Sequence, residues 1–249
     1  LALQVAALRV ADVESLTPDS AVAHERARDQ QLHIQARGAG RVRVRLVGEF
    51  APLRGPVEEA MRAIAYVGPE GAFMSGHAGW YPVAFGDHAP VRVTITGPHD
   101  GLVEGTRESR NVDGDQVTST WTNERPFEPL TLVAGPWKVV DREHRGTALH
   151  AYFHEDDLSL APAYLDAVAR YLDEYSARFG PYPFGSFAVV EHFLPTGYGF
   201  ATFTLLGKSV VRLPFIIATS LRHEVAHCWW GNGVLVGEVA RLLHAERIH

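Results

Sequence analysis

The chain has 249 residues, 46% of them hydrophobic and 21% charged, and its formal net charge is −6. This composition excludes a disordered chain, and the length suffices to bury a core without disulfides. The single cysteine, Cys228, excludes an internal disulfide framework. The acidic charge makes nucleic acid a poor partner. No stretch approaches the roughly 20 apolar residues that a transmembrane helix needs, so we expect one or two globular domains.

Short alternating patterns of apolar and polar residues fill the first 150 residues and predict β-strands. From Val42 to Leu46, apolar residues alternate with arginines, as in a strand with one buried face. Asp113-Gly114 predicts a turn between two strands. The first ten residues predict a strand rather than a signal peptide, because they lack a basic segment and a cleavage site. Strands are also expected at residues 32–34, 91–96 and 117–121.

The pattern changes after about Asp156. Apolar residues recur at helical spacing from Leu160 to Phe179, and Gly180-Pro181 ends that helix. Beyond it we expect strands at residues 186–190 and within 204–213, and one helix over 215–230. The expected fold class is α+β, with a β-rich N-terminal domain at residues 1–155 followed by the start of an α/β domain at residues 156–249.

Residues 223–227 have the sequence His-Glu-Val-Ala-His. On a helix, positions i and i+4 share one face, so His223 and His227 can present imidazole nitrogens to one ion. Zinc suits this pair, because it accepts tetrahedral nitrogen and oxygen ligands. Glu224 is adjacent, need not bind the ion, and is placed to take a proton from activated water. The competing interpretation is a helix with two hydrogen-bonded histidines that flank an exposed glutamate.

The third ligand distinguishes the classes of zinc peptidase. Metzincins need a glycine and a histidine where this chain has Trp230 and Gly233, so that class is excluded. Gluzincins take a glutamate from the next helix, and Glu246 follows His227 after 18 intervening residues. On a helix Glu246 shares the apolar face, where a carboxylate is costly unless it is paired or bound to metal. Glu238 is the weaker candidate, and fraying at the chain end is the alternative for Glu246.

The residues from His223 to Asn232, with Glu246 at its interval, resemble the zinc signature of the aminopeptidase-N (membrane alanyl aminopeptidase) family of gluzincins. Trp80-Tyr81-Pro82 and the residues from Phe179 to Phe184 resemble landmarks of that family in the same order. The resemblance implies a saddle-like β N-domain, a thermolysin-like catalytic domain and a helical domain after it. It also implies one Zn²⁺ ion held by His223, His227 and Glu246, catalysis by Glu224, a peptide substrate, and substrate contacts from Tyr198 and Gly199.

The chain departs from this family in three ways. The family anchors the free amine of its substrate with a glutamate, whereas the corresponding residues 197–203 contain no carboxylate. An ammonium group buried without a counter-charge binds poorly. Glu246 lacks the Asn-Glu-Gly context of the family's third ligand. The tyrosine that stabilises the oxyanion in the family lies beyond the position of His249, so we expect the chain to be truncated within its catalytic domain.

The expected function is that of a zinc metallopeptidase that hydrolyses peptide bonds. Resemblance favours an aminopeptidase, and the missing amine anchor favours an endopeptidase or another amide hydrolase. The alternative from a different class is a catalytically inactive binding or scaffold fragment of such a peptidase. No signal or transmembrane segment in this chain assigns a compartment.

Three further features bear on the site. Cys228, beside a histidine of the motif, is expected to be a packing residue rather than a nucleophile. His150 and His154 form either a second metal site or an ordinary pair of histidines at a strand end. Glu191-His192 has the chemistry of an acid–base pair, but nothing in the sequence connects it to a substrate.

Overall fold

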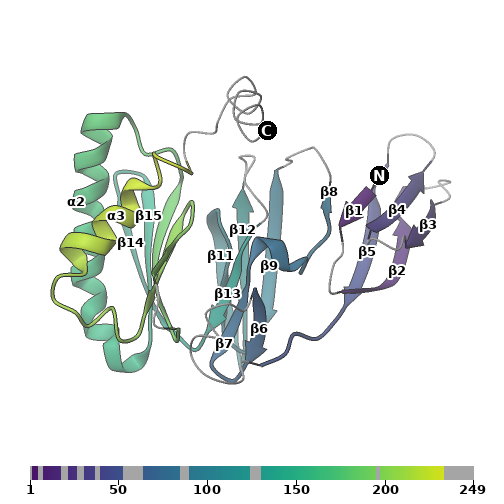
Figure 1. The fold of residues 1–249 in the computed structure, drawn as a ribbon, viewed down its shortest axis with the longest axis horizontal. Helices are drawn as coiled ribbons and strands as arrows, with labels where there is room; N and C mark the ends of the chain where they lie inside the picture. The colour runs from purple at the N-terminus through teal and green to yellow at the C-terminus, as the bar shows by residue number, and fades with distance from the viewer. Residues whose placement is uncertain are drawn as a thin grey trace, which may run out of the picture. The chain divides into compact units, whose positions relative to one another are not determined.

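The computed structural model describes residues 2–4, 8–17, 22–26, 31–36, 40–52, 64–84, 90–123, 130–194 and 197–232 (Figure 1). The chain divides into two compact units. The first comprises Leu1–Val103 and Glu108–Pro136, and the second comprises Glu104–Arg107 and Trp137–His249. None of the helices in these described ranges is long and apolar enough to cross a bilayer.

Strands dominate the first part of the chain, as the alternating patterns predict. They are β1 (Ala2–Gln4), β2 (Arg9–Ser15), β3 (Val22–Arg26), β4 (Gln31–Ala36), β5 (Val42–Val47), β6 (Ala65–Gly68), β7 (Gly71–Met74), β8 (Val83–Ala84), β9 (Val91–Gly97), β10 (Asp100–Leu102), β11 (Thr106–Asp113), β12 (Gln116–Asn123) and β13 (Leu132–Gly135), with a short 3₁₀ helix η1 (Gly76–Ala78). They pair in the orders β3-β4-β1-β8, β2-β5, β10-β13-β7-β6 and β11-β12-β9.

The alternating patterns place apolar residues in the core of the first unit. Leu32 and Ile34 of β4 are buried. They pack against partly buried valines of β2 and β5 and against Leu46 of β5. Trp121 of β12 is also buried, and its indole nitrogen donates a hydrogen bond to the Gly101 carbonyl at 3.1 Å. Between β11 and β12, Gly114 adopts a φ of 57°, which glycine reaches without strain, so the predicted turn is confirmed.

The second unit is built on one mixed sheet. Its strands are β14 (Lys138–His144), β15 (Thr147–Phe153), β16 (Ser186–His192), β17 (Gly197–Gly199) and β18 (Phe203–Gly207), in the order β14-β15-β16-β18-β17. The three inner strands are parallel, and β14 and β17 are antiparallel edge strands. The helices are η2 (Glu155–Leu160), α2 (Ala161–Phe179), η3 (Ile217–Leu221) and α3 (Arg222–Ala226).

Helices α2 and α3 lie on the same side of this sheet (Figure 1). Alternate residues of β15 and β16, including Leu149, Phe153 and Val189, are fully buried against them. Leu165 and Val168 of α2 complete this core. The side chains on this face are apolar because burying them between sheet and helix removes them from water.

The structure confirms the α+β class and the helix predicted over residues 160–179. The expected domain boundary near 155 differs from the observed division after Pro136. Strands β14 and β15 precede residue 155, but β15 pairs in parallel with β16 and therefore belongs to the sheet of the second unit. Their alternating pattern is the same as that of the earlier strands, so the sequence pattern does not distinguish the two sheets.

Residues 104–107 interrupt the first unit in sequence but belong to the second unit. The Gly105 N–H donates to Thr202 Oγ1 at 2.8 Å, and the buried Ser186 hydroxyl donates to the Gly105 carbonyl at 2.7 Å. Arg107 donates to the Tyr152 hydroxyl at 2.9 Å and pairs with Asp141. Residues 104–107 thus supply hydrogen bonds to three elements of the second unit.

Stability is expected to fall in mild acid because of His192, the last residue of β16, which is 1% exposed. Burial, and then the charge of His154, lower the pKa of His192 to about 4. The unfolded chain binds the proton below about pH 6.5 and the folded chain does not, so protonation favours unfolding. We expect urea denaturation to show a loss of about 2–3 kcal/mol between pH 7 and pH 4.5.

The variant His192→Asn tests this prediction. An asparagine oxygen can accept the Leu194 N–H that His192 Nδ1 accepts at 3.2 Å, but it does not titrate. The loss of stability between pH 7 and 4.5 is expected to shrink by most of that amount in the variant. Parallel pH profiles of variant and wild type would rule out His192 as the cause.

Candidate functional site

The two histidines of the motif point at one another from the open face of α3. Leu221, Val225 and Cys228 form the buried face of this segment, each with 0% exposure. His223 and His227 lie on the other face, and their Nε2 atoms are 2.9 Å apart. Their rings are perpendicular, with centroids separated by 4.5 Å. The i, i+4 spacing therefore places the two rings side by side on one face of the segment.

The donor atoms of this pair fit a zinc ion. His227 Nδ1 lies 3.1 Å from the Trp230 carbonyl oxygen. Because a carbonyl only accepts, this nitrogen carries the proton and Nε2 keeps its lone pair for a metal. Two nitrogens at roughly 2.0–2.1 Å from a tetrahedral zinc lie about 3.3 Å apart. The observed Nε2–Nε2 separation of 2.9 Å is shorter than this value and is that of a hydrogen bond between the two rings, as in the competing interpretation.

Edge strand β17 runs beside the motif. Gly199 pairs with Thr204 of β18, whose hydroxyl donates to the Tyr198 carbonyl at 3.1 Å. The Glu224 carboxylate reaches Gly199, where a Cβ atom would lie 2.1 Å from Oε2. The structure thus brings Gly199, Glu224 and His227 together. The side chain of Tyr198 lies beside Phe200, with ring centroids 6.4 Å apart.

Three tyrosines of α2 hold the backbone of the segment that carries the motif. Their hydroxyls donate to backbone carbonyls, Tyr164 to Val211 at 2.9 Å, Tyr171 to Ile217 at 2.9 Å and Tyr175 to Arg222 at 3.2 Å. The helical spacing of these tyrosines in the sequence predicts only that they share a buried face. The hydroxyl groups are the sequence feature that could have indicated these hydrogen bonds, because a buried Tyr O–H needs an acceptor.

The helix observed in the region 215–230 is shorter than the single helix expected there, and it is irregular. Its first turn, η3, is a π-helix in which the Leu221 N–H donates to the Ile216 carbonyl at 2.9 Å. Regular helix ends at Ala226, and the chain continues in turns to Asn232. Such π turns are frequent at functional sites, since they rotate the following residues relative to a regular helix. The π turn immediately precedes Arg222 and the motif.

Cys228 is expected to resist thiol reagents in the folded protein. Its side chain is fully buried, and its Sγ lies 3.5 Å from the Ala201 carbonyl oxygen. Burial raises the pKa of this thiol to about 12. We expect Ellman's reagent to label the chain only after denaturation, at one thiol per chain. Fast labelling of the native chain would contradict the packing role and restore the nucleophile hypothesis.

The other candidate histidines are paired with carboxylates. His150 Nδ1 lies 2.9 Å from Asp141 Oδ1, and His154 Nδ1 lies 3.0 Å from Glu191 Oε1. The described residues contain no cluster of three or more histidine, cysteine or acidic side chains that could hold a metal. This holds for His150 and His154 and equally for His223, Glu224 and His227. Glu191 is fully buried, and its Oε2 accepts the backbone N–H of His154 at 2.8 Å.

The predicted third ligand lies outside the described residues. Glu246 and the weaker candidate Glu238 both follow residue 232, the last residue that the structure describes. The assignment of Glu246 to the metal therefore stays a prediction. The two histidines and Glu224 are the part of the predicted constellation that the structure describes.

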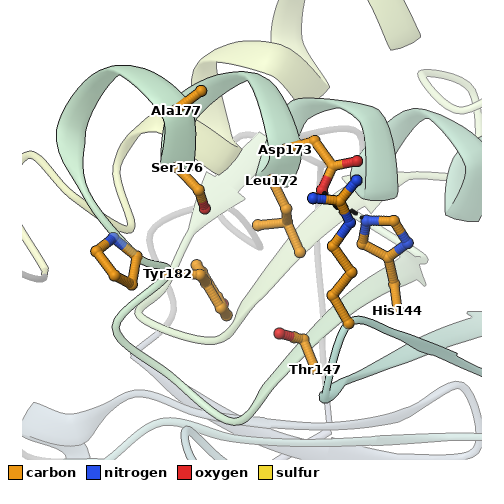
Figure 2. A pocket seen from close by; sticks show the side chains of 9 residues that line it. His144, Thr147, Leu172, Asp173, Ser176, Ala177 and Tyr182 are labelled. Atoms are coloured by element: carbon orange, nitrogen blue, oxygen red, sulfur yellow. Dashed lines mark hydrogen bonds and ion pairs between the residues drawn. The ribbon is translucent and has the colours of Figure 1, made fainter.

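A cavity of about 470 Å³ lies elsewhere in the second unit. The tip of the β14–β15 hairpin and the C-terminal half of α2 line it (Figure 2). Asp173 of α2 points toward the hairpin, where His144 Nε2 lies 2.8 Å and Arg145 Nε lies 3.3 Å from its Oδ1. These ion pairs join the hairpin to the helix. No residue of α3 or β17 lines this cavity.

Comparison with known proteins shows the fold. No protein-family model matches the chain, and neither does any curated protein. The crystal structure of an M1 zinc metallopeptidase from Deinococcus radiodurans matches 93% of this chain with 20% identity and a TM-score of 0.65. A point mutant of a Deinococcus radiodurans M1 zinc metallopeptidase matches with 18% identity and a TM-score of 0.64.

A third match is a mutant two-domain M1 zinc metallopeptidase bound to L-arginine. The match covers 94% of this chain and 57% of the chain in that structure, with 16% identity and a TM-score of 0.60. The first two structures are covered over 56% of their length, so the chain spans a little more than half of the structures it matches. Along nearly its whole length, the chain has the fold of the matching part of M1 zinc metallopeptidases.

Proposed function

We propose that this chain is a zinc-dependent metallopeptidase of the gluzincin type. His223, His227 and Glu246 hold one zinc ion, and Glu224 is the catalytic base. The observation that carries the proposal is the convergence of the two Nε2 atoms at 2.9 Å, with Glu224 on the adjacent position of the same helix. The fold shared with M1 zinc metallopeptidases supports it.

The residues act in the following way. The Trp230 carbonyl holds the His227 ring in the tautomer whose Nε2 is unprotonated and can bind metal. Zinc, when bound, supplies Lewis-acid activation of the scissile carbonyl and of water. Glu224 takes the proton of the attacking water and delivers it to the leaving amine. The tyrosine hydroxyls of α2 and the edge strand β17 fix the helix that carries these groups.

The substrate is a peptide, and an assay can decide whether it must have a free N-terminal amine. An aminopeptidase of the aminopeptidase-N type needs an acidic group for the free amine, and residues 197–203 supply none. A substrate with a blocked or internal bond needs no such group. The two possibilities predict opposite preferences between aminoacyl nitroanilides and N-blocked, internally quenched peptides.

Metal titration and hydrolysis assays test the proposal together. Isothermal titration of the metal-free chain is expected to give one zinc per chain, and His223→Ala and Glu246→Ala each weaken binding by at least tenfold. His144→Ala, which removes a histidine paired with Asp173, serves as the control and leaves zinc affinity unchanged. The zinc-loaded wild type is expected to cleave one of the two substrate types. Zinc binding without cleavage of either would indicate a scaffold instead.

A further inference from the structure

The sequence places a glycine where the base of the proposed reaction is held. An ideal Cβ on Gly199 would lie 2.1 Å from Glu224 Oε2, 3.3 Å from Glu224 Cδ and 3.7 Å from His227 Cδ2. Real Cβ atoms essentially never approach an oxygen to 2.1 Å. The carboxylate therefore occupies the space that any other residue at position 199 would fill.

The backbone itself does not require glycine at this position. Gly199 pairs with Thr204 as an ordinary strand residue, and its φ lies outside the positive region where glycine is favoured. Gly197, two residues earlier in the same strand, has open space around it, since a Cβ there would come no closer than 3.9 Å to Leu206 Cδ2. The steric demand is thus specific to the position that faces Glu224.

We propose that Gly199 is a positioning residue for Glu224. Because it has no side chain, Gly199 admits the carboxylate to the edge of β17, and this determines where the base lies relative to the two histidines. The inference rests on the proposed role of Glu224 as the base. An alanine at 199 forces Oε2 to retreat by more than about 1 Å, and a displacement of that size can lower a rate by about 10²-fold. Because the obstructing atom is the end of a flexible side chain, the fold itself accommodates the change.

Gly199→Ala and its matched control Gly197→Ala test this inference in two ways. Crystal structures of the metal-free variants are expected to show the Glu224 carboxylate displaced by more than about 1 Å in Gly199→Ala only, with β17 and α3 unmoved. In the zinc-loaded chain, kcat is expected to fall by about 10²-fold for Gly199→Ala. Zinc affinity is expected to stay within about threefold for both variants, because the two histidines are untouched.

The outcomes separate this inference from the proposed function. A carboxylate that stays in place in Gly199→Ala overturns the inference, and so does an equal loss of kcat in both variants. If the wild-type chain cleaves no peptide while the carboxylate still moves in Gly199→Ala alone, the proposed function fails and the steric role of Gly199 stands. The metal-free structures thus decide the inference without any assay of activity.

Discussion

Glu224→Gln is expected to lower kcat for peptide hydrolysis by about 10²–10⁴-fold while zinc still binds at one ion per chain. The amide keeps the size of the side chain beside Gly199 but cannot take a proton from water. His223→Ala is expected to abolish both zinc binding and hydrolysis, because it removes one of the two converging nitrogens. The pair of variants separates the proton-transfer role from the ligand role.

Each measurement has an outcome that contradicts the assignment. Zinc content is read by elemental analysis of the purified variants, and hydrolysis by initial rates at saturating zinc. If Glu224→Gln loses zinc as His223→Ala does, Glu224 is a ligand rather than the base. If it retains full activity, the general base lies elsewhere.

Asp157→Ala is expected to lower the free energy of unfolding by about 2 kcal/mol, because it removes a buried carboxylate and the hydrogen bonds that the half-exposed Arg212 donates to it. Asp157 is 4% exposed, and Arg212 donates to both of its oxygens, at 2.7 and 2.9 Å. Burial alone would raise the pKa of Asp157, but the hydrogen bonds and positive charge of Arg212 outweigh it and lower the pKa below its usual range. The lowered pKa means that this contribution is present at neutral pH and is lost in acid.

The adjacent residue provides a matched control. Asp156 pairs with Lys208 at 3.2 Å, but both side chains are exposed, so Asp156→Ala is expected to change stability by less than about 1 kcal/mol. Urea denaturation at pH 7 measures both variants. Equal effects would show that burial of the Asp157 carboxylate does not determine its contribution to stability.

Sequence pattern predicts the elements whose signal is local. The helical spacing from Leu160 to Phe179 and the stop at Gly180 match α2 almost residue for residue. The i, i+4 spacing of His223 and His227 predicts their shared face, since any helical segment of one turn imposes it. The alternation in β5 likewise appears as alternating exposure along that strand.

Features that depend on contacts distant in sequence are not predictable in this way. The π turn before Arg222 accepts a hydrogen bond from Tyr171 of α2 at Ile217, and nothing local in residues 217–221 indicates it. The membership of β14 in the second sheet depends on pairing with β15, not on its own pattern. The need for glycine at 199 arises from a side chain 25 positions later in the sequence, so no local pattern around that glycine predicts it.

The insertion of residues 104–107 into the second unit determines how this protein can be dissected. A fragment that begins at Trp137 contains every strand of the mixed sheet but lacks Gly105 and Arg107. The buried Ser186 hydroxyl, Thr202 Oγ1 and the Tyr152 hydroxyl then lose the hydrogen bonds that they make with the Gly105 backbone and the Arg107 guanidinium. Unmet buried polar groups are costly, so minimal fragments for metal-binding work should start upstream of Glu104 or carry these four residues as a graft.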